Sequence, residues 1–142
     1  MFKISISLII LNGFAWGQTN FDTLRCNRNA LLEFYNNLDS LSYQTADKFL
    51  LTFDESCVNN AEYSEWSNEL LYKFLENNPS MLIEILLKEK PFKRNYIYKN
   101  LTQPIHDGVD LKMIYSRVEK VNMNNEVTMN ILKNIKTAIN KL

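Results

Sequence analysis

The sequence predicts an all-α protein, a compact bundle of helical hairpins with about six or seven helices. Three observations favour this class. Apolar residues recur at helical spacing in several long segments, glycine and proline are scarce at three each, and no segment shows a convincing strand pattern. Scarce glycine and proline, together with long periodic segments, favour helix, because the many turns between short strands need these two residues.

Residues 62–90 give the clearest pattern and predict a helical hairpin. In its first half the apolar side chains return every three or four positions, as on one helix face: Tyr63, Trp66, Leu70, Leu71, Phe74 and Leu75. Asn59 followed three residues later by Glu62 has the form of a capping box, so the helix is expected to start there. Pro79 predicts the turn, because proline suits the first position of a new helix.

The second half of this hairpin is apolar on nearly every side. Between Pro79 and Pro91, Glu84 alone interrupts a run of large apolar residues: Met81, Leu82, Ile83, Ile85, Leu86 and Leu87. A helix of this kind belongs in the middle of a bundle, because water would contact apolar side chains on any exposed face. We therefore expect Leu82 and Leu86 in the core.

Weaker patterns predict the other helices. Apolar stripes at helical spacing lie in residues 31–41, 46–57, 92–101, 111–121 and 127–142. Residues 96–98 fit an extended conformation equally well. Residues 102–108 read as a loop, because they contain a proline and an Asp-Gly pair. Asp110 is the expected N-cap of the helix that follows.

The N-terminus has the layout of a secretory signal peptide. Lys3 gives it a positive start, and an apolar run with few polar residues follows. Ala15 and Gly17 then place small residues before a cleavage site that would leave Gln18 first. The alternative is an N-terminal membrane anchor, but the run is well short of the ~20 residues that a spanning helix needs. We therefore predict that residues 1–17 are a signal peptide.

Residues 18–142 are predicted to form a single all-helical domain. The chain has 16 basic and 16 acidic residues, and loss of Lys3 leaves a net charge near −1. This balance gives no reason to expect a nucleic-acid partner, and no segment after the signal reads as a membrane span. We expect an exported protein, either secreted or periplasmic.

The chain has two cysteines, Cys26 and Cys57. In an exported protein an even set of cysteines is oxidised by default. Cys26 precedes the first predicted helix and Cys57 ends the second, and these two ends of an antiparallel hairpin lie side by side. We therefore predict a Cys26–Cys57 disulfide, with two buried free thiols as the alternative. Nothing brings either cysteine to His106, the only histidine, so no catalytic cysteine is expected.

No cofactor motif and no metal site is predicted. His106, Asp107 and Asp110 are too few for a zinc site, which takes three or four ligands, and they lack the alternating carboxylates of a calcium loop. Turn and N-cap chemistry explains all three residues. We also expect no catalytic residue here.

Residues 88–99 concentrate positive charge among aromatic residues. Glu89 is the single acid beside five bases. Basic and aromatic side chains together can bind an anionic ligand by charge and stacking. The candidate binding residues are Lys88, Lys90, Lys93, Arg94, Tyr96, Tyr98 and Lys99. The alternative, which the sequence favours, is a solvated connector whose aromatic side chains face the core.

The sequence does not identify a function, and it favours a binding or structural protein that acts through its surface over an enzyme. The partner would be an unknown protein or an anionic envelope component. One alternative is a small hydrolase that uses carboxylates in a groove between hairpins, chosen from Asp54, Glu55, Glu62, Glu65 and Glu69. Another is a carrier of an apolar ligand in a core cavity lined by Leu70, Phe74, Leu82, Ile85 and Leu86.

Cleavage after Gly17 is directly testable. The expected product begins at Gln18, because the small residues before that position suit signal peptidase. Intact-mass analysis of the exported protein should give the mass of residues 18–142. A protein that keeps residues 1–17 would instead support the membrane anchor.

Overall fold

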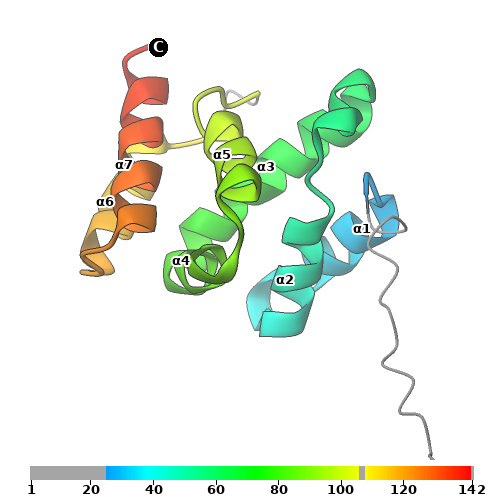
Figure 1. The fold of residues 1–142 in the computed structure, drawn as a ribbon, viewed down its shortest axis with the longest axis horizontal. Coiled ribbons are helices and arrows are strands. Elements are labelled where there is room, and N and C mark those ends of the chain that lie inside the picture. Colours follow the sequence, from blue (N-terminus) through cyan, green and yellow to red (C-terminus); the bar gives the residue numbers. More distant parts are fainter. Residues whose placement is uncertain (1–24, 106–107, 142) are drawn as a thin grey trace, which may run out of the picture.

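The computed structural model describes residues 25–105 and 108–141. These residues form seven α-helices and two short 3-10 helices, and no strand occurs among them (Figure 1). The helices are α1 Arg28–Asn36, η2 Leu38–Ser40, α2 Tyr43–Leu51, η3 Glu55–Asn59, α3 Ala61–Asn77, α4 Pro79–Lys88, α5 Pro91–Asn100, α6 Leu111–Lys120 and α7 Glu126–Ile139. The predicted all-α bundle is therefore confirmed. The predicted signal peptide, residues 1–17, lies outside the described residues.

Short polar side chains begin five of the seven α-helices. In each case a side-chain oxygen accepts a hydrogen bond from the backbone N–H three residues later, which satisfies one donor of the first turn. These N-caps are Asn27, Ser42, Asn60, Asp110 and Asn125. The other two helices, α4 and α5, begin with a proline. The prediction of Asp110 as an N-cap is confirmed.

The predicted capping box of α3 was wrong by one residue. Asn60, not Asn59, is the N-cap, and its side chain accepts from the N–H of Tyr63. Glu62 does not reach back to the cap but pairs with Arg28 of α1, with 2.7 Å between the nitrogen and the oxygen. Asn59 is the last residue of η3, so Asn60 is the residue that stands between η3 and α3 and caps the longer helix.

Helix α3 organises the bundle. It packs against α1, α4 and α6, and against both 3-10 helices. In Figure 1 it crosses the molecule between the pair α1–α2 and the pair α6–α7. Leu70, Leu71, Phe74 and Leu75 of α3 are fully buried. Neighbours on several sides explain why its apolar stripe is wide.

Helix α4 is buried along most of its length. Leu82, Ile83, Ile85 and Leu86 are at most 1% exposed, as its sequence predicts. Leu87 departs from the prediction, because it is 46% exposed. Helix α4 contacts α2, α3, α6 and α7, and these neighbours leave one side of the helix open.

Buried polar side chains hold the loop that follows α5. The Asn68 side chain donates to the Asn100 carbonyl at 3.0 Å and accepts from the Ile105 N–H at 3.1 Å. The Tyr72 hydroxyl donates to the Leu101 carbonyl at 2.8 Å. Asn68 is 1% exposed, so these bonds satisfy groups that water cannot reach. Helix α5 itself includes residues 96–98, so the extended conformation considered for them was wrong.

Of the described helices, none combines the length and the apolar character needed to cross a membrane.

The burial of α4 predicts a sharp contrast between neighbouring positions. Leu82→Ala and Leu86→Ala should each lower the free energy of unfolding by about 2–5 kcal/mol, because each leaves a cavity in the core. Glu84→Ala, on the exposed side of the same helix, should cost well under about 1 kcal/mol. Urea unfolding of the three variants measures this difference. Equal losses at the three positions would mean that α4 is not packed as described.

Candidate functional site

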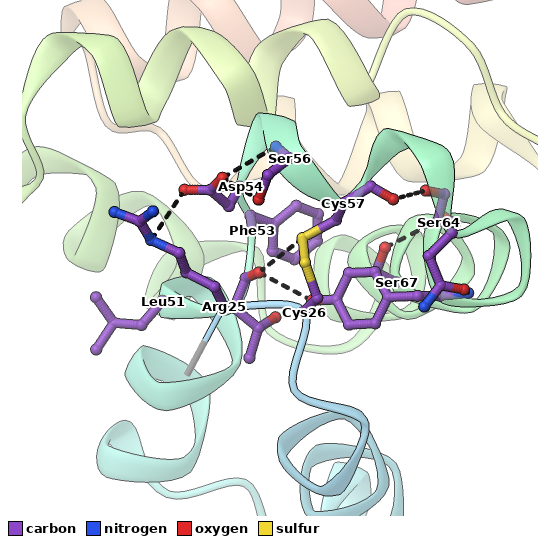
Figure 2. Close-up of a disulfide and its surroundings, with 12 residues drawn as sticks. Arg25, Cys26, Leu51, Phe53, Asp54, Ser56, Cys57, Ser64 and Ser67 are labelled. Atoms are coloured by element: carbon purple, nitrogen blue, oxygen red, sulfur yellow. Dashed lines mark hydrogen bonds and ion pairs between the residues drawn. A yellow bond between two sulfur atoms is a disulfide. The ribbon is translucent and has the colours of Figure 1, made fainter. Parts of the chain in front are cut away.

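A disulfide joins Cys26 to Cys57, as the sequence predicts (Figure 2). The two Cα atoms are 5.6 Å apart, and the bond links positions separated by 31 residues. It ties the segment before α1 to η3, the short helix that follows α2. Cys26 has a φ of 50°, in the left-handed region that is uncommon for side chains other than glycine. The neighbouring contacts therefore have to hold this residue in place.

The carbonyl of Thr52, just after α2, supplies one of those contacts. It accepts the N–H of Cys26 at 3.2 Å and the hydroxyl of Tyr63 at 3.0 Å. Thr52 is fully buried and Tyr63 is 2% exposed. One buried acceptor thus connects the N-terminal segment, the end of α2 and the start of α3.

Lys93 of α5 also contacts the end of α2. Its ammonium donates to the carbonyls of Leu51 and Phe53. Carbonyls at the C-terminal end of a helix carry partial negative charge, which attracts a cation. Burial lowers the pKa of Lys93, because a desolvated ammonium is less stable than a hydrated one. The positive charge of Lys93 therefore has a structural role in joining α5 to α2.

A groove of about 710 Å³ opens beside these contacts, between the end of α2 and the corner where α4 meets α5. Arg25, Leu51, Phe53, Asp54 and Glu55 form one wall. Figure 2 shows Arg25 and Asp54 beside the disulfide. The corner supplies the other wall. The complete lining is Arg25, Leu51, Phe53, Asp54, Glu55, Lys88, Glu89, Lys90, Phe92, Lys93 and Tyr96.

Asp54 is fixed in its ionised form on this wall. It accepts hydrogen bonds from the hydroxyl and the N–H of Ser56, at 2.7 and 2.9 Å, and these bonds lower its pKa. Arg25 adds an ion pair at 3.5 Å. A general acid needs a raised pKa, so Asp54 does not suit that role.

The groove brings together four of the seven residues predicted to bind an anion. Lys88, Lys90, Lys93 and Tyr96 line it, while Arg94 and Lys99 do not. Lys88 also donates to the Tyr43 hydroxyl at 2.8 Å.

Tyr98 faces the core instead of the groove and is 8% exposed. Its place on α5 puts it on the side that packs against α7. Stacking of a ligand on Tyr98 would require the helix to move, so Tyr96 is the tyrosine of this segment that a ligand can reach.

Five lining residues belong to no site predicted from the sequence: Arg25, Leu51, Phe53, Glu89 and Phe92. Arg25 directly precedes Cys26, so the predicted disulfide was a signal that Arg25 would lie near the end of α2. Phe92 is 72% exposed, although phenylalanine is usually buried. Its position after Pro91, at the first turn of α5, places it at the corner.

The carboxylates considered for a hydrolase mostly have structural partners. Glu62 pairs with Arg28, and Glu69 pairs with Lys73 at 2.6 Å. Asp54 is held by Ser56 and Arg25, and only Asp54 and Glu55 line the groove. The contacts do not place two of these carboxylates as an acid and base pair.

An apolar core cavity and a metal site both gain little support from the described residues. The five side chains expected to line an apolar cavity are at most 1% exposed, and none lines the groove. Two smaller hollows, of about 420 and 300 Å³, also lie elsewhere.

Within residues 25–105 and 108–141, no three His, Cys, Asp or Glu side chains are placed to hold a metal ion. His106 and Asp107 lie outside that part of the chain.

Comparisons with protein-family models, with curated proteins and with solved structures give no match for this chain. The functional argument therefore rests on the groove and the residues that line it.

The disulfide should contribute strongly to stability. Closing a loop of this length restricts the unfolded chain by about 3.7 kcal/mol in the chain-entropy model. We expect the double variant Cys26→Ser, Cys57→Ser to melt roughly 10 °C or more below the native protein. Calorimetry of both proteins measures the shift, and treatment with a thiol reductant should reproduce it in the native protein only. A variant as stable as the native protein would contradict the assigned role.

Tyr63 should make stability depend on alkaline pH. Burial raises the pKa of this phenol from 10.0 to about 12, so between these values the unfolded chain loses the proton and the folded chain keeps it. The stabilisation is complete below pH 10 and is lost as the pH rises to about 12, a loss on the order of 3 kcal/mol. Tyr63→Phe removes this titration, so its stability should fall less over that range.

Urea unfolding of Tyr63→Phe and the native protein at several pH values tests this. At neutral pH the variant should be about 1 kcal/mol less stable, because it lacks the hydrogen bond to Thr52. The remaining tyrosines are the same in both proteins, so the difference isolates Tyr63. If the unfolding free energies of the two proteins fell in parallel from pH 9 to 12, the Tyr63 phenol would have the same pKa in the folded and the unfolded chain, contrary to this prediction.

Proposed function

We propose that this protein is an exported binding protein that takes an anionic ligand in the groove beside the disulfide. One observation carries the proposal: two exposed lysines, Lys88 and Lys90, and the exposed ring of Phe92 line one groove, and Arg25 lines it from a distant part of the sequence. Its volume of about 710 Å³ lies in the range of ligand sites, about 300–1,000 Å³.

The lining residues divide into different roles. Lys88 and Lys90 are exposed and supply positive charge that a ligand can reach. Phe92 and Tyr96 offer flat apolar surface beside them. Lys93 is committed to the carbonyls of α2 and supports the shape of the groove.

Two features support export. A disulfide persists in oxidising compartments, such as the periplasm or the extracellular space, and is rare in the cytosol. The N-terminal residues have the layout of a secretion signal. An exported binding protein would meet anionic envelope components or other exported proteins.

The test compares two double variants that remove the same charge. Lys88→Ser with Lys90→Ser changes the groove, whereas Arg94→Ser with Lys99→Ser changes the same segment outside it. The probes are heparin, phosphatidylglycerol vesicles and polyglutamate. The native protein should bind at least one of them at low salt, and binding should weaken at ionic strengths where the screening length falls below about 8 Å. The groove variant should lose this binding, and the matched variant should keep it.

Equal losses in the two variants would mean that diffuse positive charge, not the groove, holds the probe. No binding by the native protein to any of the three probes would contradict the binding of a uniformly anionic ligand in the groove. Circular dichroism and melting curves of both variants show whether a loss of binding reflects a loss of structure.

A further inference from the structure

The charge in the groove is mixed. Four cations line it, but so do three carboxylates: Asp54, Glu55 and Glu89. Two of the cations are also engaged inside the protein, because Arg25 pairs with Asp54 and Lys93 binds backbone carbonyls. A uniformly anionic polymer or membrane would meet repulsion from the carboxylates as well as attraction from the lysines.

The groove also presents apolar surface at its edge. Phe92 is 72% exposed, which is the largest exposure among the large apolar residues of the described chain. Leu51 and Tyr96 are half-buried beside it in the lining. Exposed aromatic rings next to charged groups are typical centres of protein interfaces. A ligand that uses this surface has to bring an apolar group of its own.

We infer that the ligand is a segment of a partner protein in which an acidic side chain lies close to a large apolar one. This inference rests on the proposed function of the groove. A polypeptide supplies charges of both signs and apolar side chains at neighbouring positions, which matches the lining of the groove. The acidic side chain meets Lys88 and Lys90, the apolar side chain packs on Phe92, and a basic side chain can approach Glu55.

The experiment selects peptides on the intact protein. A phage-displayed library of random heptapeptides is screened on the immobilised protein, and the selected peptides are synthesised. Acidic residues within two positions of an aromatic or large aliphatic residue should be enriched among them. Phe92→Ala should weaken the selected peptides by about tenfold or more, as for the central residue of an interface.

A charge reversal tests the register of the contact. Lys90→Glu should weaken the selected acidic peptide by about tenfold, and replacing the acidic residue of the peptide by lysine should restore binding to this variant. Met129→Ala is the matched control for Phe92→Ala. Met129 is also apolar and is 59% exposed, but it lies on α7 away from the groove. This control should bind the peptide as the native protein does.

The outcomes separate this inference from the proposed function. If heparin or vesicles bind in the groove but no peptide is selected, the groove binds an anion that is not a protein segment, and the inference fails. Peptides that bind Phe92→Ala and Lys90→Glu as tightly as the native protein would occupy another surface, which also overturns it. If neither peptides nor polyanions bind, both proposals fail.

Discussion

The end of α2 is the point on which the rest of the structure depends. Three successive residues there, Leu51, Thr52 and Phe53, offer carbonyls where the helix ends, and each accepts a donor from another part of the chain. The donors come from the N-terminal segment, from α3 and from α5. Unsatisfied buried carbonyls would be costly, so these bonds join the N-terminal segment, α3 and α5 to the end of α2. The disulfide then fixes the first of them covalently.

The same contacts form the walls of the groove, so the candidate site and the stability of the fold are not independent. Arg25 is held beside the groove because the next residue, Cys26, is bonded to Cys57. Lys93 belongs to the lining but serves the fold. Lys90 and Phe92 also line the groove but do not contribute to these structural contacts. Substitutions at these two positions can therefore change binding without loss of structure.

Local patterns predicted which segments are helical, because caps, prolines and apolar spacing act within a few residues. The ends were less accurate, since α1 ends at Asn36 and α2 at Leu51, before the ends expected from the stripes in residues 31–41 and 46–57. The disulfide was also predicted from the order of two helices, although Cys57 lies in η3 and not at the end of α2. The N-cap of α3 was missed by one residue, because η3 continues to Asn59 and leaves Asn60 as the cap. Neighbouring bases on α5 look equivalent in the sequence, yet Lys93 turns toward α2 while Arg94 and Lys99 lie outside the groove. That difference depends on which distant segment covers each face, and no local pattern encodes it.

The disulfide also bears on the order in which the chain can fold. The contact of Lys93 with Phe53 joins residues 40 apart, and closing so long a loop costs conformational entropy before other contacts compensate it. Oxidation of Cys26 and Cys57 closes an earlier loop and fixes α1 and α2 as one unit. Helix α5 can then dock onto a surface that already exists. In an oxidising compartment the N-terminal hairpin would therefore mature first and act as a template for the later helices.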